Sequence, residues 1–333
     1  MRGNQMKKNK SSSYVAIWLS GYVIKLLVLL ITIHLITNHC LYGAFLEHGG
    51  ATKTGSLGRA GVAYVEDLES ILVNPAGLIF SSDKQIGFEY QKYFYGLESA
   101  GDIPGYYPVN LNTGFVGAVL PLKKTGVFGF AWSNFSSARQ YNENIFSLTY
   151  SGDPSVVFHF LEDEEWGSGI NIKFLTVEYI KNSDVLELFE KYGNRVSGIT
   201  FDFGLKYYFS EEHNGAIAFV IKNIYPVDIG LVKQETIPRE LNFGLLYRLK
   251  SLKFVFELKT RTTQTTNEII PCSGIESFLT NFLSIRTGLN PSEFTLGLGT
   301  SLGSIECNYC FVLPYRLVDI GTTHRIGLIF KWK

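Results

Sequence analysis

Apolar and polar positions alternate along most of the chain. From about residue 85 onward, segments of roughly nine to eleven residues show the two-residue period of a β-strand with two different faces. In residues 199–209 the odd positions are apolar, whereas Thr200, Asp202 and Lys206 occupy even positions. We count about fourteen such segments, which begin near Gln85, Thr113, Val127, Asn144, Ile170, Ile199, Ala216, Glu240, Leu252, Ser273, Phe282, Phe294, Ile305 and His324.

The two faces of these segments differ in composition, and this bears on the kind of β protein. A soluble β-sandwich also alternates, so the period alone fits either kind. Here one face carries Phe, Leu, Ile and Tyr, and the other carries Lys, Glu, Asp, Arg, Asn and Gly. A lipid-facing wall around a wet lumen produces that division. We therefore predict an all-β fold, a transmembrane antiparallel β-barrel of about 14 strands over residues 85–333, in a Gram-negative-type cell outer membrane.

Charged residues on the polar face are predicted to point into the lumen. There they form an ion-pair network, line a pathway, or are simply solvated. The residues chosen on this basis are Lys173, Asp202, Lys206, Arg248, Lys253 and Glu257.

The links between the segments support a barrel, because short turns alternate with longer loops. Two links depart from this pattern: residues 151–166 form a long link where a turn is expected, and residues 290–292 form a short one where a loop is expected. The count can therefore differ by one hairpin. Residues 184–192 have helical spacing, so one loop is predicted to carry a short helix.

The N-terminal part of the chain divides into a leader and a segment that is not predicted to form barrel strands. Residues 1–44 combine basic positions with the uncharged apolar run 26–37, which is typical of a signal peptide, although an uncleaved helical anchor is the alternative. Residues 45–84 are glycine-rich at first and then weakly helical, and they contain the turn sequence 74–77. We predict that this segment is a compact plug.

Within the plug, two short motifs are the candidate site. Gly58 and Gly61 flank Arg59 closely and are expected to allow tight folding. Asn74, Pro75 and Gly77 form a strong signal for a turn or a helix start. One interpretation is that Arg59, Asn74 and Pro75 hold the plug against the barrel wall; the other is that they only cap a local turn.

The composition of the chain indicates no nucleic-acid partner, metal site or catalytic centre. Thirty basic and thirty acidic residues give zero formal charge, so no nucleic-acid partner is indicated. Cys307 and Cys310 are three positions apart on a predicted strand and should face opposite sides, so no metal site is expected there. None of the histidines has a recognisable nucleophile setting. The chain is therefore predicted to be no enzyme and to need no cofactor.

Six short segments carry a resemblance to a known family: residues 58–64, 66–70, 74–78, 132–136, 238–241 and 323–328. The Asn-Pro-Ala-Gly sequence at 74–77 is the most specific of them, and together they span nearly the whole chain after the leader. These segments resemble the FadL-like outer-membrane proteins, especially their PorV/PorQ and UPF0164 branch.

This resemblance implies a fourteen-stranded barrel with an N-terminal segment folded into its lumen. It also implies passive uptake of hydrophobic small molecules such as long-chain fatty acids, which FadL-type members carry. The alternative is a shuttle or assembly role in type IX protein secretion, as in PorV-type members, and the third reading is an outer-membrane hydrolase. Expected partners are outer-membrane lipids and either a hydrophobic ligand or a secreted protein.

Overall fold

The computed structural model describes residue 45 and residues 51–95, 110–122, 125–137, 140–154, 165–180, 186–209, 214–315 and 321–333. All of these belong to one compact unit, His39–Lys333. The predicted leader, residues 1–44, lies outside the described residues. Among the helices in the described part of the chain, none is long and apolar enough to span a bilayer.

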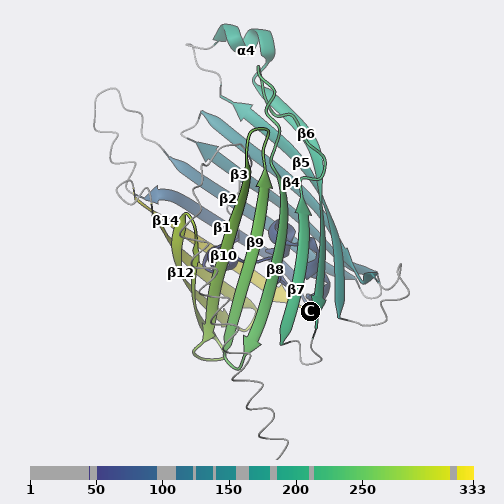
Figure 1. Cartoon of the computed structure of the whole chain (residues 1–333), viewed down its shortest axis with the longest axis vertical. Coiled ribbons are helices and arrows are strands. Elements are labelled where there is room, and N and C mark those ends of the chain that lie inside the picture. Colours follow the sequence, from purple (N-terminus) through teal and green to yellow (C-terminus); the bar gives the residue numbers. More distant parts are fainter. Residues whose placement is uncertain are drawn as a thin grey trace, which may run out of the picture. The chain divides into compact units, whose positions relative to one another are not determined.

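Fourteen antiparallel strands form a closed barrel, because β1 pairs with both β2 and β14 (Figure 1). This confirms the predicted fold and strand number. The strands are β1 Lys84–Tyr95, β2 Leu111–Leu122, β3 Gly126–Ser137, β4 Tyr141–Gly152, β5 Trp166–Tyr179, β6 Arg195–Tyr208, β7 Gly215–Lys222, β8 Arg239–Leu249, β9 Leu252–Thr262, β10 Asn267–Phe278, β11 Leu283–Asn290, β12 Glu293–Leu302, β13 Ile305–Pro314 and β14 Thr322–Trp332.

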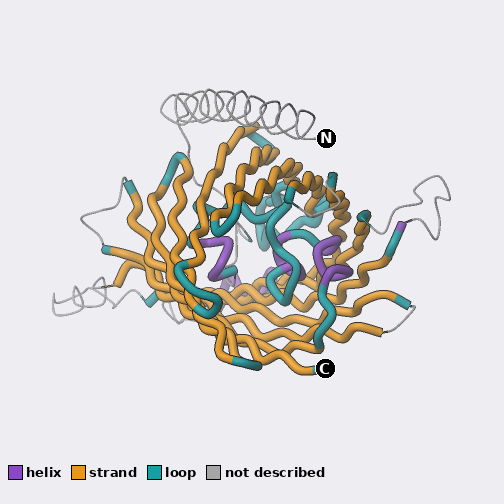
Figure 2. Tube along the Cα trace, turned by 90° about the horizontal axis from the view of Figure 1, so that it is seen from below, coloured by secondary structure: helices purple, strands orange, loops and turns teal. Residues whose placement is uncertain are grey.

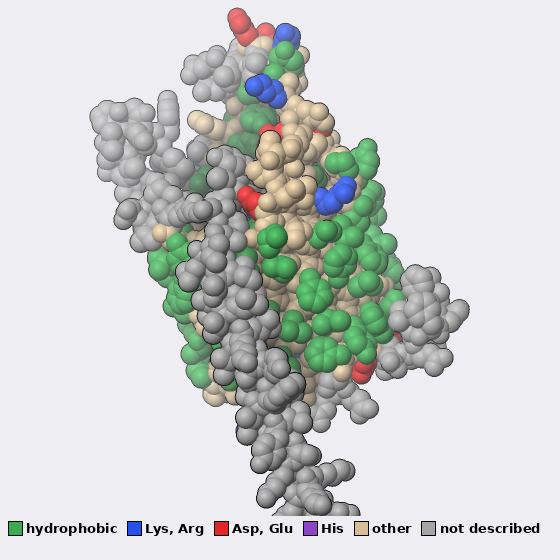
Figure 3. Space-filling view, viewed as in Figure 1, with side chains coloured by type: hydrophobic (Ala, Val, Ile, Leu, Met, Phe, Trp, Pro, Cys, Tyr) green, Lys and Arg blue, Asp and Glu red, His purple; other side chains and the backbone are tan. Residues whose placement is uncertain are grey.

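The period-two pattern determines which side chains face out. Phe88, Phe146 and Phe201 are exposed on the outer surface, and apolar side chains gather over the visible strands in Figure 3. Closure of the sheet leaves few backbone groups unpaired, which a bilayer requires. Buried charged side chains of the strands lie on the opposite face, toward the lumen: Glu89, Glu143, Asp202, Lys206, Glu240, Glu257, Lys259, Arg261, Glu276, Arg286, Glu293 and Arg325.

The strands are unequal in length, so one side of the barrel is taller. β5 and β6 have 14 residues each and lead to the helix α4 (Leu186–Tyr192), which lies beyond the other strands in Figure 1. β7 and β11 have only eight residues each. The structure contains both links that depart from the alternation of turns and loops. Residues 153–165 separate β4 from β5, and residues 291–292 separate β11 from β12. Neither link changes the number of strands from the predicted fourteen.

Residues 51–83 fold inside the ring of strands (Figure 2). Their helices are α2 (Thr52–Gly55), α3 (Ser70–Val73) and the 3-10 helix η1 (Pro75–Phe80). β1 begins at Lys84, directly after this segment. We call residues 51–83 the plug.

The plug packs against the wall through two apolar clusters. One joins its Leu57 and Val62 to wall residues that include Leu246. The other joins Leu68 and Ile71, with Leu78, to residues of β2, β3 and β14. Apolar burial on two flanks gives the plug its position, and polar contacts then fix its orientation.

Candidate functional site

Asn74 caps a helix and contacts the wall with the same side chain. It is fully buried, and its Oδ1 accepts the N–H of Ala76 at 3.0 Å, while Pro75 occupies the first helical position. Its Nδ2 donates to the carbonyl of Val62 in the plug at 2.8 Å and to that of Leu205 in β6 at 3.5 Å. The local cap and the attachment to the wall are therefore two roles of one residue.

Wall glycines make room for this turn. A Cβ on Gly169 of β5 would overlap the backbone of Pro75, and a Cβ on Gly204 of β6 would overlap the side chain of Asn74. Gly77 is confined in the same way inside the plug. The Asn-Pro turn therefore lies directly on the backbone of the β5–β6 wall.

The first plug motif contacts the opposite part of the wall. Gly58 and Arg59 both have left-handed backbones, with φ of 65° and 67°, a conformation that costs little only for glycine. The N–H of Gly58 donates to Oγ1 of Thr295 at 3.0 Å. Arg59 donates two hydrogen bonds to the carboxylate of Glu293, at 2.6 and 3.0 Å, so a planar guanidinium–carboxylate pair holds this turn in place.

Carboxylates of the wall also bind backbone amides of the plug. Glu257 of β9 accepts the N–H groups of Gly61 and Val62 at 2.6 and 2.9 Å. Glu89 of β1 accepts both the N–H and the hydroxyl of Thr52, at 2.7 and 2.6 Å. The carboxyl groups of Glu257 and Glu89 thus accept hydrogen bonds from N–H groups that the irregular backbone of the plug would otherwise leave unpaired.

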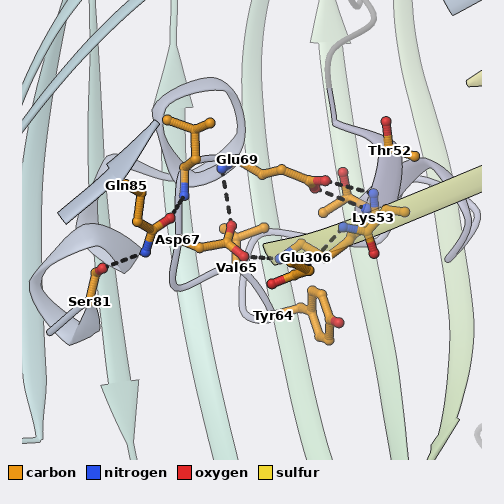
Figure 4. Close-up of polar contacts among 12 residues, drawn as sticks. Thr52, Lys53, Tyr64, Val65, Asp67, Glu69, Ser81, Gln85 and Glu306 are labelled. Carbon is orange, nitrogen blue, oxygen red and sulfur yellow. Dashed lines mark hydrogen bonds and ion pairs between the residues drawn. The ribbon is translucent and has the colours of Figure 1, made fainter. Parts of the chain in front are cut away.

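A further polar cluster, which the sequence did not reveal, lies around Lys53 (Figure 4). Its ammonium group contacts the carboxylate of Asp67 in the plug and that of Glu306 in β13, the latter at 3.0 Å. The backbone N–H of Lys53 donates a hydrogen bond to Oε1 of Glu69 at 2.6 Å. Asp67 and Glu69 are 14 and 16 positions from Lys53, whereas Glu306 belongs to a strand near the other end of the chain, and no local pattern marks these residues as partners.

Glu66 of the plug links two of the predicted lumen residues. Its Oε1 lies 2.8 Å from Nζ of Lys206 and 3.4 Å from Nη2 of Arg248. Burial raises the pKa of Glu66, but the ammonium of Lys206 and the guanidinium of Arg248 more than offset this and hold that pKa below its ordinary value of 4.5. The carboxylate therefore remains ionised and paired at neutral pH.

This depressed pKa predicts an acid-dependent contribution to stability. A carboxyl group whose pKa is lower in the folded protein stabilises it above the unfolded pKa, and the stabilisation is lost as the pH falls through the folded value. We expect Glu66→Gln to lower the melting temperature of the detergent-solubilised barrel at pH 7, by an amount that shrinks well below pH 4.5. Exposed Glu187→Gln in α4 is the control. A difference that stays constant across the pH range would contradict the assignment.

The other predicted lumen residues also lie inside the barrel. Nζ of Lys173 in β5 is 2.6 Å from Oδ1 of Asp202 in β6. Nζ of Lys253 in β9 is 3.1 Å from Oε2 of Glu276 in β10. Together with the contacts of Glu257, Lys206 and Arg248, these pairs place all the predicted charged residues in ion pairs or plug contacts.

A cavity of about 120 Å³ lies between the plug and the taller part of the wall. Ile71 and Leu72 of the plug and Ile145 and Leu175 of the wall give it an apolar side. Charged side chains give it a polar side: Arg59, Lys173, Asp202, Lys222, Glu240, Glu257, Lys259 and Arg325. The arrangement suits a molecule with an apolar body and a polar group.

A second cavity, of about 260 Å³, lies at the end of the barrel where β1 begins. It is lined by Tyr64, Glu66, Arg248 and Lys253, among others. Because these groups are mostly charged, it resembles a water-filled vestibule. Plug residues therefore line both an amphipathic cavity and a polar one.

No metal-binding group is found among the described residues. Cys307 is partly exposed and Cys310 is fully buried, on opposite faces of β13, and both are free. One nucleophile motif escaped the sequence analysis, since residues 299–303 read Gly-x-Ser-x-Gly. Its Ser301 is exposed near the end of β12, which leads into the hairpin to β13 and not into a helix. The strand-to-helix turn that exposes a catalytic serine is therefore not formed there.

The barrel has the same fold as several solved hydrocarbon channels. CymD, a monoaromatic hydrocarbon channel, aligns over 84% of this chain and 97% of its own with a TM-score of 0.57 and 10% identity. The Pseudomonas putida toluene transporter TodX aligns over 86% and 99% with a TM-score of 0.58 and 10% identity. The Ralstonia pickettii toluene transporter TbuX aligns over 87% and 100% with a TM-score of 0.51 and 10% identity.

At this identity the likeness establishes the fold. The barrel fold expected from the FadL-like resemblance is thus confirmed, whereas the PorV/PorQ and UPF0164 branch stays a prediction. No family model matches the chain, and no curated protein matches it in sequence.

Proposed function

We propose that this chain is an outer-membrane channel for the passive uptake of hydrophobic small molecules. The observation that carries the proposal is the amphipathic cavity of about 120 Å³ between the plug and the taller wall. The barrels of like fold described as hydrocarbon channels and toluene transporters support it. Long-chain fatty acids, expected from the FadL-like resemblance, are the finer form of the proposal.

The mechanism is a shift in the population of plug conformations. In the described state, plug residues lie inside the ring of strands and line both cavities, so we expect passage of a solute along the lumen to require their displacement (Figure 2). A ligand that binds the cavity more tightly when the plug is displaced will favour the displaced state. The plug is held by two apolar clusters and by hydrogen bonds and ion pairs to the wall, and water entering the lumen can replace the polar part of these contacts.

The test is mass spectrometry of lipids and proteins that remain with the barrel after gentle extraction from its native membrane. We expect a stoichiometric apolar molecule. Leu175→Trp should abolish its retention, because Leu175 is buried and lines the cavity. The matched control is Phe174→Trp, whose side chain is exposed on the opposite face of the same strand.

One result of this mass spectrometry would overturn the proposal that the chain is a channel. If a secreted protein copurifies in stoichiometric amount, and no apolar molecule does, the chain acts in protein secretion. Retention of the same molecule by Leu175→Trp would place the ligand outside this cavity.

A further inference from the structure

Phe45, the residue directly after the predicted leader, lies on the lumen side of the wall. Its side chain packs against an apolar cluster that includes Leu175 and Val177 of β5, and it lines the cavity of about 120 Å³. Its backbone nitrogen is 3.0 Å from Oε2 of Glu143 in β4, a residue that is only 3% exposed. The position that follows the leader is therefore fixed inside the barrel.

This position is near the extracellular end of the barrel. The end where β1 begins carries the two-residue turns 250–251 and 303–304, whereas the opposite end carries α4 and the longer link 223–238. Outer-membrane barrels have short turns on the periplasmic side and longer loops outside, so the end with α4 is extracellular. Glu143 is the third residue of β4, which starts at this extracellular end.

The position of Phe45 bears on the leader, which the sequence allows to be either a cleaved signal peptide or an uncleaved anchor. Phe45 is eight positions after Thr37, the last residue of the apolar run 26–37. Eight residues of fully extended chain cover at most about 29 Å, and β4 from Glu143 to Gly152 already spans about 30 Å. Thr37 of an uncleaved chain could thus extend no farther than the periplasmic rim of the barrel. The apolar run could not be an anchor in the inner membrane, on the far side of the periplasm.

The backbone of Phe45 also favours a chain that starts at this residue. Its φ of 57° lies in the left-handed region, where the carbonyl of a preceding residue crowds the Cβ of a bulky side chain. In a chain that begins with Phe45 no carbonyl precedes it, so this crowding is absent. The preceding residues Gly43 and Ala44 are small, as residues before a leader cut usually are, whereas Tyr42 is not. The sequence alone therefore leaves the cut open, and the geometry of Phe45 favours this position.

We propose that the leader is removed directly before Phe45 and that the new α-ammonium group forms an ion pair with Glu143. Hydrolysis by a leader peptidase adds one water across the peptide bond: residues 1–44 leave with a carboxylate end, and the nitrogen of Phe45 becomes an amine, which takes up a proton at neutral pH. This nitrogen is already placed for a charge-assisted hydrogen bond to Oε2, while Oε1 accepts the hydroxyl of Tyr141 at 2.6 Å. The first residue of the mature chain is thus held beside the cavity that it lines, whatever molecule the channel carries.

Two measurements on the barrel purified from its native outer membrane test the proposal. Peptide mass spectrometry should find the N-terminus of the mature chain at Phe45. Acylation of the α-amine by N-hydroxysuccinimidyl acetate is then compared between the folded barrel and the denatured chain. Because only the neutral amine reacts, the ion pair should slow acylation at least about tenfold, the size of one charge-assisted contact.

Two variants assign the protection to Glu143. Glu143→Gln should raise the acylation rate of the folded barrel by about the same factor, since the amide keeps an acceptor but not the charge. Glu178→Gln is the matched control: Val177 pairs with Glu143 across the β4–β5 ladder, and its neighbour Glu178 faces the outer side of the sheet. It removes the same charge close by and should leave the rate unchanged. If Glu143→Gln does not assemble, the folded and denatured forms of the native barrel still give the comparison.

The outcomes separate the cut, the ion pair and the channel. A retained leader, or an N-terminus at any other residue, would overturn the proposed cut and with it the ion pair. Equal acylation of the folded and denatured native barrel, or an equal increase in Glu178→Gln and Glu143→Gln, would overturn the ion pair alone. None of these results bears on the uptake of hydrophobic molecules, which is tested by the molecule that copurifies.

Discussion

Asn74→Ala is expected to raise the conductance of the barrel to small ions and solutes. The substitution removes the cap on Ala76 and leaves the carbonyl of Val62 without its donor in a fully buried place. Loss of a cap costs about 1 kcal/mol and each unpaired buried group about 1–3 kcal/mol, so the seated plug should lose about 2–4 kcal/mol. At about 1.4 kcal/mol per factor of ten, the displaced fraction rises on the order of a hundredfold.

Single-channel recording in planar bilayers measures this effect, and a wall asparagine provides the comparison. Asn144 lies on β4, and its side chain accepts hydrogen bonds from Trp132 and Asn134. Asn144→Ala removes hydrogen bonds without touching the plug, so its conductance should match that of the native barrel. If the conductance of Asn74→Ala is no higher than that of this control, the Asn-Pro turn only caps a local helix and does not hold the plug in place.

The barrel could be predicted from the sequence because the pattern that identifies its strands lies within each strand. Successive side chains of a strand face opposite sides, so a lipid-facing wall and a wet lumen must appear as alternation within a single strand. Residues 199–209 show this directly, with Phe201 exposed and Asp202 buried. Even the irregular links 153–165 and 291–292 did not disturb the count, since the strands on either side kept their period.

The plug contacts could not be predicted in the same way. Motif residues such as Arg59 and Asn74 were visible in the sequence, but their partners were not: Glu293 is 234 positions from Arg59, and Leu205 is 131 positions from Asn74. A carboxylate on the polar face of a strand looks the same whether it binds the plug, pairs with a lysine, or meets water. Only the closed register of the barrel decides among these outcomes.

The same argument applies to Gln91 and Arg325. Each has the residue type and position of an ordinary lumen residue. Their adjacency depends on the pairing of β1 with β14, which joins the two ends of the barrel, and no pattern within either strand predicts it.

Gly288→Val should displace the plug more than any other substitution considered, and it is the most direct test of the contact between the plug and the wall. Gly288 lies on β11, where a Cβ would overlap the backbone of Leu57 and Gly58, and backbone cannot rotate away as a side chain can. We expect a folded barrel with a displaced plug, high conductance, and rapid proteolysis within residues 51–83. Gly114→Val is the control, since a Cβ at Gly114 has no atom within 4 Å. Because assembly of Gly288→Val can itself fail, Gly288→Ala serves as the milder variant, and native conductance and protease resistance in a folded Gly288→Ala barrel would show that the plug does not depend on this contact.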